Sequence, residues 1–173
     1  MILAINGATT EPCPLEEDIR IAGECGYQAI EIRMNKLEKY LQESGLVDLK
    51  RLMDRAGVRP WSVNAIGMAT LRDARGTAQV EREAERFAEL AAALECPWIL
   101  ACPGPKPEDA SWDEILTRSA ADIARLADVA WRRGVFLGFD GVVSVEIFNH
   151  EHNRMDQLSV AQQAFSAVKA FIG

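Results

Sequence analysis

The densest group of side chains that could bind a metal lies in residues 134–152, GVFLGFDGVVSVEIFNHEH. Glu146 stands within an apolar, strand-like run, and His150, Glu151 and His152 follow it closely. Carboxylates and imidazoles are metal ligands, and a carboxylate can also act as a general base. Burying a lone carboxylate costs several kcal/mol unless it is paired or bound to a metal. Glu146 is therefore the first candidate for both catalysis and metal binding.

Other interpretations stay open for these side chains. Glu146 could be an inward-facing residue paired with an arginine such as Arg33. Glu31 could form an ordinary salt bridge with Arg33, because the two side chains share one face of a strand. His150 and His152 would point to opposite sides of an extended backbone, as in a solvated loop.

Composition limits the classes of function. The chain has 173 residues, of which 49% are hydrophobic, so we expect one domain over residues 1–173. The net charge of -7 argues against nucleic acid and anionic membranes as partners. Neither a membrane-spanning run nor a signal peptide is evident. We expect a cytoplasmic protein whose four cysteines are free thiols.

Apolar runs and helical periodicity alternate along the chain. Strands are expected at Ile2–Asn6, Ala29–Met34, Val58–Ile66, Trp98–Cys102, Val135–Phe139 and Val142–Phe148. Helices are expected from Pro14 to Gly26, over Lys36–Ala56 with a break near Ser44–Gly45, over Ala78–Glu95, from Ser111 to Arg133 and from about Met155 onward. This order predicts an α/β fold of parallel strands covered by helices. The alternation breaks once, where only Asp140 and Gly141 separate two strands.

Polar side chains follow the expected strands at the points where the strands end. In parallel α/β folds the chemistry lies at the carboxyl ends of the strands. Asn6, Glu31, Arg33 and Asn64 stand at such ends, as does Glu146. We expect the first four to line a substrate pocket.

Four stretches together carry a family resemblance: NGATT, GYQAIEIRMNKLEKYL, WSVNAI with the LRD that follows, and DGVVSVEIFN. They resemble the xylose-isomerase-like TIM barrels, a superfamily of sugar-phosphate isomerases and epimerases, and within it the inosose isomerases. The resemblance covers two blocks, residues 1–139 and 140–173. The first block corresponds to the first five strands of the barrel, and the second to its last strand and helix.

The resemblance implies a divalent metal, Mn²⁺, Zn²⁺ or Mg²⁺, held by Glu, Asp, His and Glu on the last four strands. Glu146 matches the strand-eight ligand, and Asp140 stands where the strand-five Glu would be. His150 could supply a substitute donor. The stretch that would carry strands six and seven is absent, which implies a truncated barrel with an incomplete metal site.

The family's chemistry is proton abstraction next to a carbonyl, with the metal stabilising the enediolate. With an incomplete site, we expect no turnover of a sugar or polyol by this chain. The alternatives are an isomerase with a rebuilt metal site, a self-associating barrel remnant and a sugar-binding module.

Six strands cannot close the barrel that eight strands close, because strand number, tilt and shear are linked. The two-residue connection is too short for a parallel crossover. We therefore expect Val142–Phe148 to run antiparallel to Val135–Phe139 or to continue it. Either arrangement leaves strand edges exposed, which favours a homodimer formed by edge pairing or by swapping.

Overall fold

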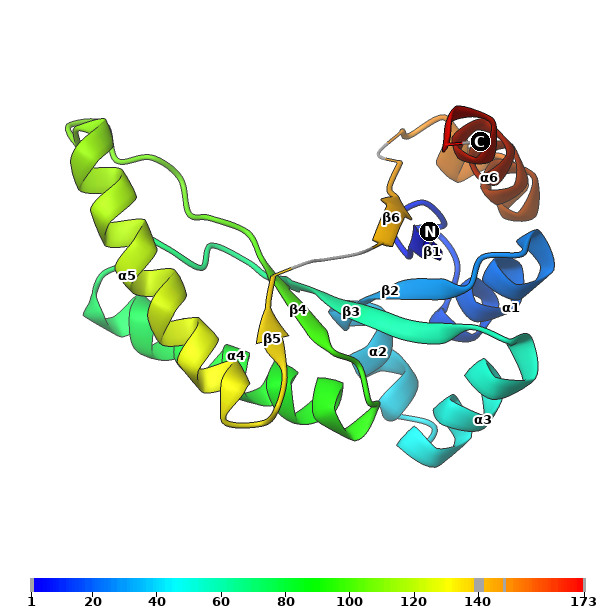
Figure 1. Ribbon diagram of the computed structural model, residues 1–173, viewed down its shortest axis with the longest axis horizontal. Coiled ribbons are helices and arrows are strands. Elements are labelled where there is room, and N and C mark those ends of the chain that lie inside the picture. Colours follow the sequence, from blue (N-terminus) through cyan, green and yellow to red (C-terminus); the bar gives the residue numbers. More distant parts are fainter. Residues whose placement is uncertain (1, 139–141, 148, 173) are drawn as a thin grey trace. The chain divides into compact units, whose positions relative to one another are not determined.

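The computed structural model describes residues 2–138, 142–147 and 149–172. Contacts divide the chain into two compact units, residues 1–61 with 140–173, and residues 62–139. The single domain over residues 1–173 stays a prediction. Strands and helices alternate along the chain as expected (Figure 1).

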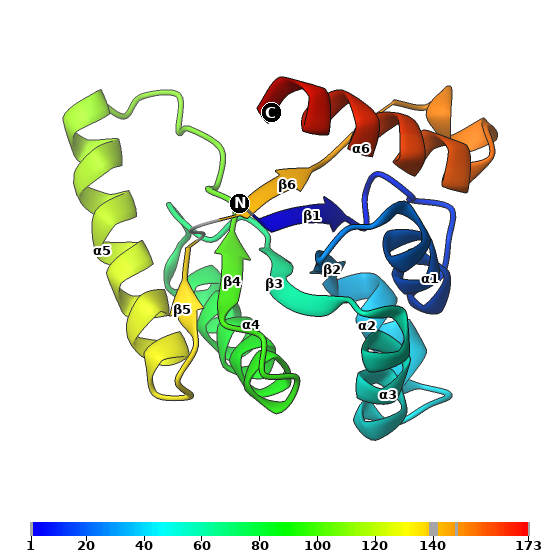
Figure 2. The same ribbon diagram turned by 45° about the vertical axis from the view of Figure 1, so that its right-hand side comes forward.

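The sheet of the first unit is built around β1 (Ile2–Asn6). This strand pairs in parallel with β2 (Ala29–Arg33) on one side and with β6 (Val142–Val145) on the other (Figure 2). Ile5 is in register with Ile30 and with Val145, so the carboxyl ends of the three parallel strands lie at the same edge of the sheet. Their carboxyl ends can therefore present side chains to one common site.

The pairing of β6 differs from the sequence-based expectation. The sequence analysis expects this strand to run antiparallel to the preceding strand or to continue it, whereas the structure pairs it in parallel with β1. The physical reason is that β1 is buried and apolar, and an unpaired edge of such a strand would leave backbone N–H and C=O groups without partners. Asp140, which precedes β6 in the sequence, lies outside the described residues.

Helices of the first unit cover this sheet. They are α1 (Leu15–Cys25), α2 (Met34–Leu41), α3 (Leu46–Ala56), the short 3-10 helix η1 (His152–Arg154) and α6 (Gln157–Ile172). α1 packs against both α3 and α6. Gly23 permits the close approach of α1 and α3, because a Cβ atom there would lie 2.6 Å from the carbonyl oxygen of Ala56. The predicted break between α2 and α3 is confirmed.

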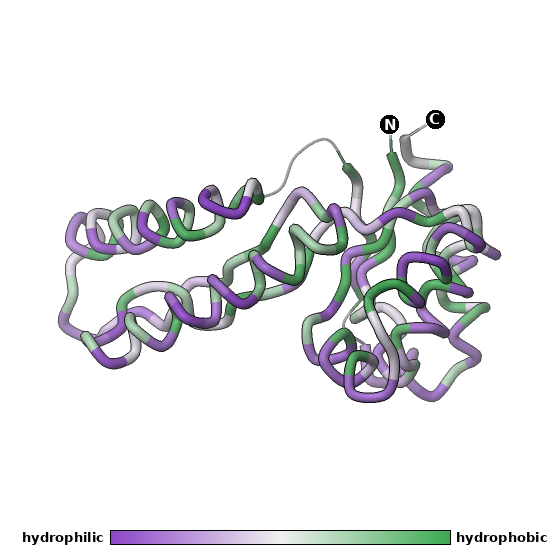
Figure 3. The backbone as a smooth tube through the Cα atoms, turned by 90° about the horizontal axis from the view of Figure 1, so that it is seen from below, coloured by the Kyte–Doolittle hydropathy of each residue, from purple (hydrophilic) through white to green (hydrophobic). Residues whose placement is uncertain are grey.

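The second unit has its own parallel strands. β3 (Arg59–Ile66), which begins in the first unit, pairs with β4 (Trp98–Ala101), and β4 pairs with β5 (Phe136–Leu137). Two long helices, α4 (Ala74–Ala93) and α5 (Trp112–Trp131), pack on each other. Hydrophobic and hydrophilic positions alternate along the helices of both units (Figure 3).

Side-chain caps fix where the two long helices begin. The side chain of Ser111 accepts a hydrogen bond from the backbone N–H of Glu114, which confirms Ser111 as the predicted start of α5. Asp73 accepts one from Gly76 in the same way, so α4 begins four residues earlier than the expected Ala78. The sequence analysis overlooked this cap because Asp73 lies in a stretch that it assigned to a loop.

All four cysteines are free thiols, as predicted. Within the described part of the chain, no helix combines the length and the hydropathy needed to cross a membrane.

Candidate functional site

The end of β1 organises the candidate site. Asn6 is fully buried, and its side-chain amide donates a hydrogen bond to the carboxylate of Glu31, its register partner at the end of β2. The amide oxygen of Asn6 accepts a hydrogen bond of 2.8 Å from the backbone N–H of Ala8. One side chain therefore ties the loop after β1 to a buried carboxylate on the neighbouring strand.

Glu146 lies directly after the last residue of β6 and is exposed. The sequence analysis places this side chain within a buried strand, and that placement is wrong. The pairing of β6 with β1 ends at Val145, so Glu146 stands beyond the hydrogen-bonded part of the strand. Its carboxylate is consequently available at the edge of the site rather than enclosed in the core.

The hydroxyl of Thr9 holds the backbone on both sides of Glu146. It donates a hydrogen bond of 2.9 Å to the carbonyl oxygen of Val145 and accepts one of 3.1 Å from the N–H of Ile147. Thr9 is itself buried, with 1% of its surface exposed. The loop after β1 therefore positions two carboxylates, Glu31 through Asn6 and Glu146 through Thr9.

Charged side chains at the end of β2 act on the pKa of Glu146. Partial burial raises the pKa of Glu146, the neighbouring Glu31 carboxylate raises it further, and Arg33 lowers it. The Glu31 carboxylate and the Arg33 guanidinium, both on β2, therefore lie close enough to act on the carboxylate of Glu146. A carboxylate with a raised pKa is closer to the range in which a general base works best near neutral pH.

The remaining predicted site residues are distributed differently. Asn64 lies on β3 in the second unit and is half-buried. His150 is exposed in the turn before η1, and Asp140 lies outside the described residues. Among residues 2–138, 142–147 and 149–172, no three His, Cys, Asp or Glu side chains gather in a group that could hold a metal ion. The described side chains alone therefore supply no such group, and the incomplete metal site that the resemblance implies stays a prediction.

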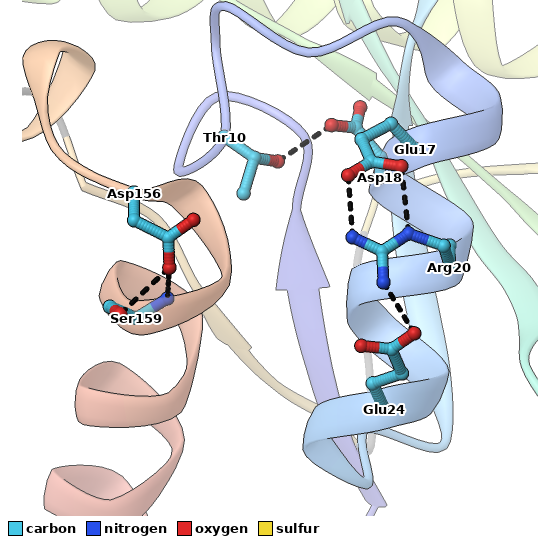
Figure 4. A network of polar contacts seen from close by, with 7 residues as sticks. All are labelled: Thr10, Glu17, Asp18, Arg20, Glu24, Asp156 and Ser159. Atoms are coloured by element: carbon cyan, nitrogen blue, oxygen red, sulfur yellow. Dashed lines mark hydrogen bonds and ion pairs between the residues drawn. The ribbon is translucent and has the colours of Figure 1, made fainter.

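A buried ion pair beside the site escaped the sequence analysis. Lys36 Nζ lies 2.8 Å from Oδ2 of Asp18, and the two side chains are 7% and 1% exposed. Lys36 also donates to the carbonyl oxygens of Gly7 and Thr10. The Thr10 hydroxyl donates to Asp18, whereas Arg20 on the same helix pairs with acids at the surface (Figure 4). The pair thus anchors the loop that carries Thr9.

One signal in the sequence could have revealed Asp18. It lies three residues after Leu15 and four before Ala22, which places it on the buried face of α1 among apolar residues. From the sequence it was placed only within the expected helix from Pro14 to Gly26. A charged residue at a core position of a helix calls for a buried partner.

A polar cavity of about 340 Å³ lies next to the ion pair, on the side of the loop before α1. Its lining comes from the loop and helix start at residues 11–16 and from α2 and the turn after it, and includes Cys13, Lys36, Lys39 and Tyr40. Burial raises the pKa of the Cys13 thiol, and Asp18 raises it further. The thiol therefore carries little thiolate at neutral pH and is no candidate nucleophile.

Comparison with known proteins agrees with the arrangement of strands and helices. The sequence profile of the xylose isomerase-like TIM barrels matches residues 19–138. The chain belongs to this family. The family is thus assigned through the stretch that contains β2, β3, β4 and the long helices of the second unit.

Two curated relatives of the chain are inosose isomerases. The protein from Bacillus velezensis is 31% identical over 144 residues, which cover 82% of this chain and 51% of the relative. The protein from Halalkalibacterium halodurans is 29% identical over 170 residues, which cover 97% of this chain and 58% of the relative. The chain therefore spans little more than half the length of the curated relatives that it matches.

Among solved structures, the IOLI protein, whose crystal structure holds a bound zinc atom, shares the fold. Its TM-score is 0.90 at 19% identity, over 97% of this chain and 96% of that chain. The α/β, TIM-barrel-like architecture predicted from the sequence is confirmed.

Replacing Thr9 with valine should loosen the backbone around Glu146 while leaving the shape of the side chain unchanged. We expect the free energy of unfolding to fall by about 1–3 kcal/mol, because the buried Val145 carbonyl and the Ile147 N–H lose their partner. Thr9→Ser retains the hydroxyl, so its free energy of unfolding should fall by less. Urea unfolding gives the free energies, and faster amide exchange at Ile147 in the valine variant alone would locate the effect.

Equal destabilisation by serine and valine would contradict this role, since it would show that the methyl group of Thr9 matters rather than the hydroxyl.

Proposed function

We propose that this chain binds a sugar or cyclic polyol at the carboxyl ends of β1, β2 and β6, and that it does not isomerise this ligand on its own. The inosose isomerases among its relatives suggest inosose, a cyclic polyol ketone, as the first ligand to test. The observation that carries the proposal is that these strand ends hold a polar site but, among the described residues, no group of three metal ligands. Asn6, Glu31 and Glu146 are held together at the strand ends, whereas no described group of three ligands is present.

The polar groups at these strand ends suit hydroxyl recognition. Carboxylates accept hydrogen bonds from hydroxyl groups, and a guanidinium donates to hydroxyl or carbonyl oxygens. Glu146 is exposed and Arg33 is half-buried, so both can reach a ligand at this edge. Such charge-assisted hydrogen bonds are stronger than those between neutral groups.

Isomerisation requires more than recognition. A base must remove the proton next to the carbonyl, and a positive group must stabilise the resulting enediolate. Glu146 has the raised pKa that suits a base. A divalent metal would supply the stabilising charge in such a reaction. The described donors Glu31 and Glu146 are fewer than the three or more that such a metal needs.

Binding should depend on the charge of Glu146. We expect inosose to bind the wild-type chain with a Kd of about 1 mM, and Glu146→Gln to weaken binding about tenfold or more, because the charge-assisted hydrogen bond is lost. Glu151→Gln, at an exposed acid in the following turn, is the matched control and should leave binding unchanged. Isothermal titration calorimetry measures both.

The same protein, purified without chelator, should contain less than one divalent metal per chain and should not exchange the proton next to the inosose carbonyl in D₂O. If the wild-type chain exchanges this proton and Glu146→Gln does not, the chain is an isomerase with a rebuilt site, and the proposal that it does not isomerise its ligand is wrong. Failure of the wild-type chain to bind inosose or other polyols would overturn the proposed binding.

A further inference from the structure

A stripe of apolar residues runs along the whole of α5 without being buried. Its members are Trp112, Leu116, Ala120, Ile123, Ala127 and Trp131, which we call the α5 stripe. With 3.6 residues per turn, these positions share an arc about 100° wide. Trp112, Leu116 and Trp131 expose 68%, 64% and 63% of their surfaces. The buried residues of α5, Ile115, Leu126 and Ala130, are a different set.

Aromatic contacts extend the stripe at both ends. The ring of Trp131 lies 5.3 Å from that of Phe136 on β5, and Phe136 is itself 45% exposed. At the other end, Lys106 Nζ lies 5.8 Å from the centre of the Trp112 ring. Large aromatic and aliphatic side chains exposed along one helix face are typical of a protein interaction site.

The spacing of the α5 stripe has a two-fold symmetry. Each member has a counterpart at the same distance from the midpoint of the helix, which falls between Ala121 and Asp122. The symmetric pairs are Trp112 with Trp131, Leu116 with Ala127, and Ala120 with Ile123. In each aliphatic pair, a large side chain corresponds to a small one.

We propose that the α5 stripe is the interface of a two-fold symmetric homodimer in which two α5 helices pack antiparallel. A two-fold axis at the midpoint would place Leu116 against the Ala127 side chain of a second copy, and Ile123 against Ala120. Large side chains then fill the space above small ones, as close packing requires. A parallel arrangement would set Ala120 and Ala127 against themselves and leave gaps.

Charges at the helix ends favour the same direction. The first turn of α5 carries Asp113 and Glu114, whereas Arg132 and Arg133 follow its last residue. Within the chain, Glu114 also pairs with Arg118, and Arg133 pairs with Glu85 and Glu89 on α4. In an antiparallel pair, the acidic end of one helix lies beside the basic end of the other, and the helix dipoles also attract. A parallel pair would bring like ends together.

The proposed contact also limits the assembly to a dimer. An isologous interface uses the same surface on both copies, so association stops at two. The sequence analysis expects a homodimer through strand edges or swapping, whereas this interface lies on a helix face and needs no exchange of elements. A helix of 20 residues offers less area than a typical stable interface, so we expect a Kd of about 1–100 µM.

Sedimentation equilibrium of the full chain between about 1 and 200 µM tests the proposal. We expect a monomer–dimer equilibrium. Ala120→Glu, at an exposed position beside the two-fold axis, should weaken dimerisation at least tenfold, because it places two carboxylates in the apolar contact. Ala121→Glu is the matched control, since this neighbouring alanine is also exposed but faces away from the stripe, and should leave the equilibrium unchanged.

A compensating change tests the register. Ala120→Glu combined with Ile123→Lys brings opposite charges together across the axis and should recover part of the lost affinity. Far-ultraviolet circular dichroism should show unchanged helix content in each single variant. A wild-type chain that stays monomeric at 200 µM, forms larger assemblies, or dimerises equally well after Ala120→Glu would overturn the proposal.

Discussion

Lys36→Met should lower the free energy of unfolding by about 3–5 kcal/mol, because it leaves the carboxylate of Asp18 buried without its cation. Asp18 is 1% exposed, and Lys36 donates to both of its oxygens at 2.8 and 3.0 Å. Methionine fills a similar volume, so the loss reflects charge rather than packing. Lys39→Met, on the exposed side of the same helix, is the matched control and should change the free energy by less than about 0.5 kcal/mol.

The cost of Lys36→Met should also depend on pH. Burial raises the pKa of Asp18 from 3.8 to about 7, and Lys36 and Thr10 oppose this shift. The folded state therefore holds the proton more tightly than the unfolded state, and the stability contributed by this group falls as pH rises from about 4 to about 7. Without Lys36 the pKa rises further, so the loss should be large at pH 8 and small at pH 5.

Urea unfolding at the two pH values measures this difference. Asp18→Asn/Lys36→Met, which removes both charges, should be more stable at pH 8 than the single lysine variant. A pH-independent loss in the single variant would show that Lys36 contributes packing and hydrogen bonds to the loop rather than neutralisation of Asp18.

Tyr27→Ala should be similarly damaging, with a loss of about 3–5 kcal/mol. The side chain is 2% exposed, its hydroxyl donates a hydrogen bond of 3.1 Å to the Ala161 carbonyl, and its ring meets Phe165 edge-on at 5.0 Å. Tyr27 thus joins the loop before β2 to α6, the helix that follows the segment carrying Glu146. Removing the tyrosine side chain should therefore destabilise the packing of α6 more than that of the strands.

Amide exchange of α6, residues 157–172, is the direct measurement, and it should increase more than exchange of β2. Tyr27→Phe removes only the hydroxyl and should cost about 1 kcal/mol. Tyr40→Ala, at the other, half-buried tyrosine, is the control. Unchanged exchange of α6 in Tyr27→Ala would contradict this account of how the C-terminal segment is held.

Local signals in the sequence predicted the elements but not all of their partners. The acidic first turn and Gly26 delimit α1, and the cap at Ser111 delimits α5, because these signals act within a few residues. β6 offered no comparable local signal for its partner. Its pairing with β1 depends on hydrogen bonds between residues at opposite ends of the sequence.

The candidate site was also predictable only in part, because some of its features depend on contacts between distant segments. Position at a strand end identified Asn6 and Glu31, which the structure brings into contact. Their role in binding a substrate stays a prediction, as does that of Arg33. The exposure of Glu146 was not predictable, because it depends on where β6 ends and on hydrogen bonds from Thr9. Asp18 and Lys36 meet only through the packing of α1 and α2.

The central place of β1 in its sheet has a consequence for biosynthesis. Its neighbour β2 follows it in the sequence after one helix, but its other neighbour, β6, follows only after β2, β3, β4 and β5. While the segment between β1 and β6 is being synthesised, one edge of an apolar strand therefore stays open to other nascent chains. Chaperone dependence during expression, and slow completion of folding after release, are the expected results of this order.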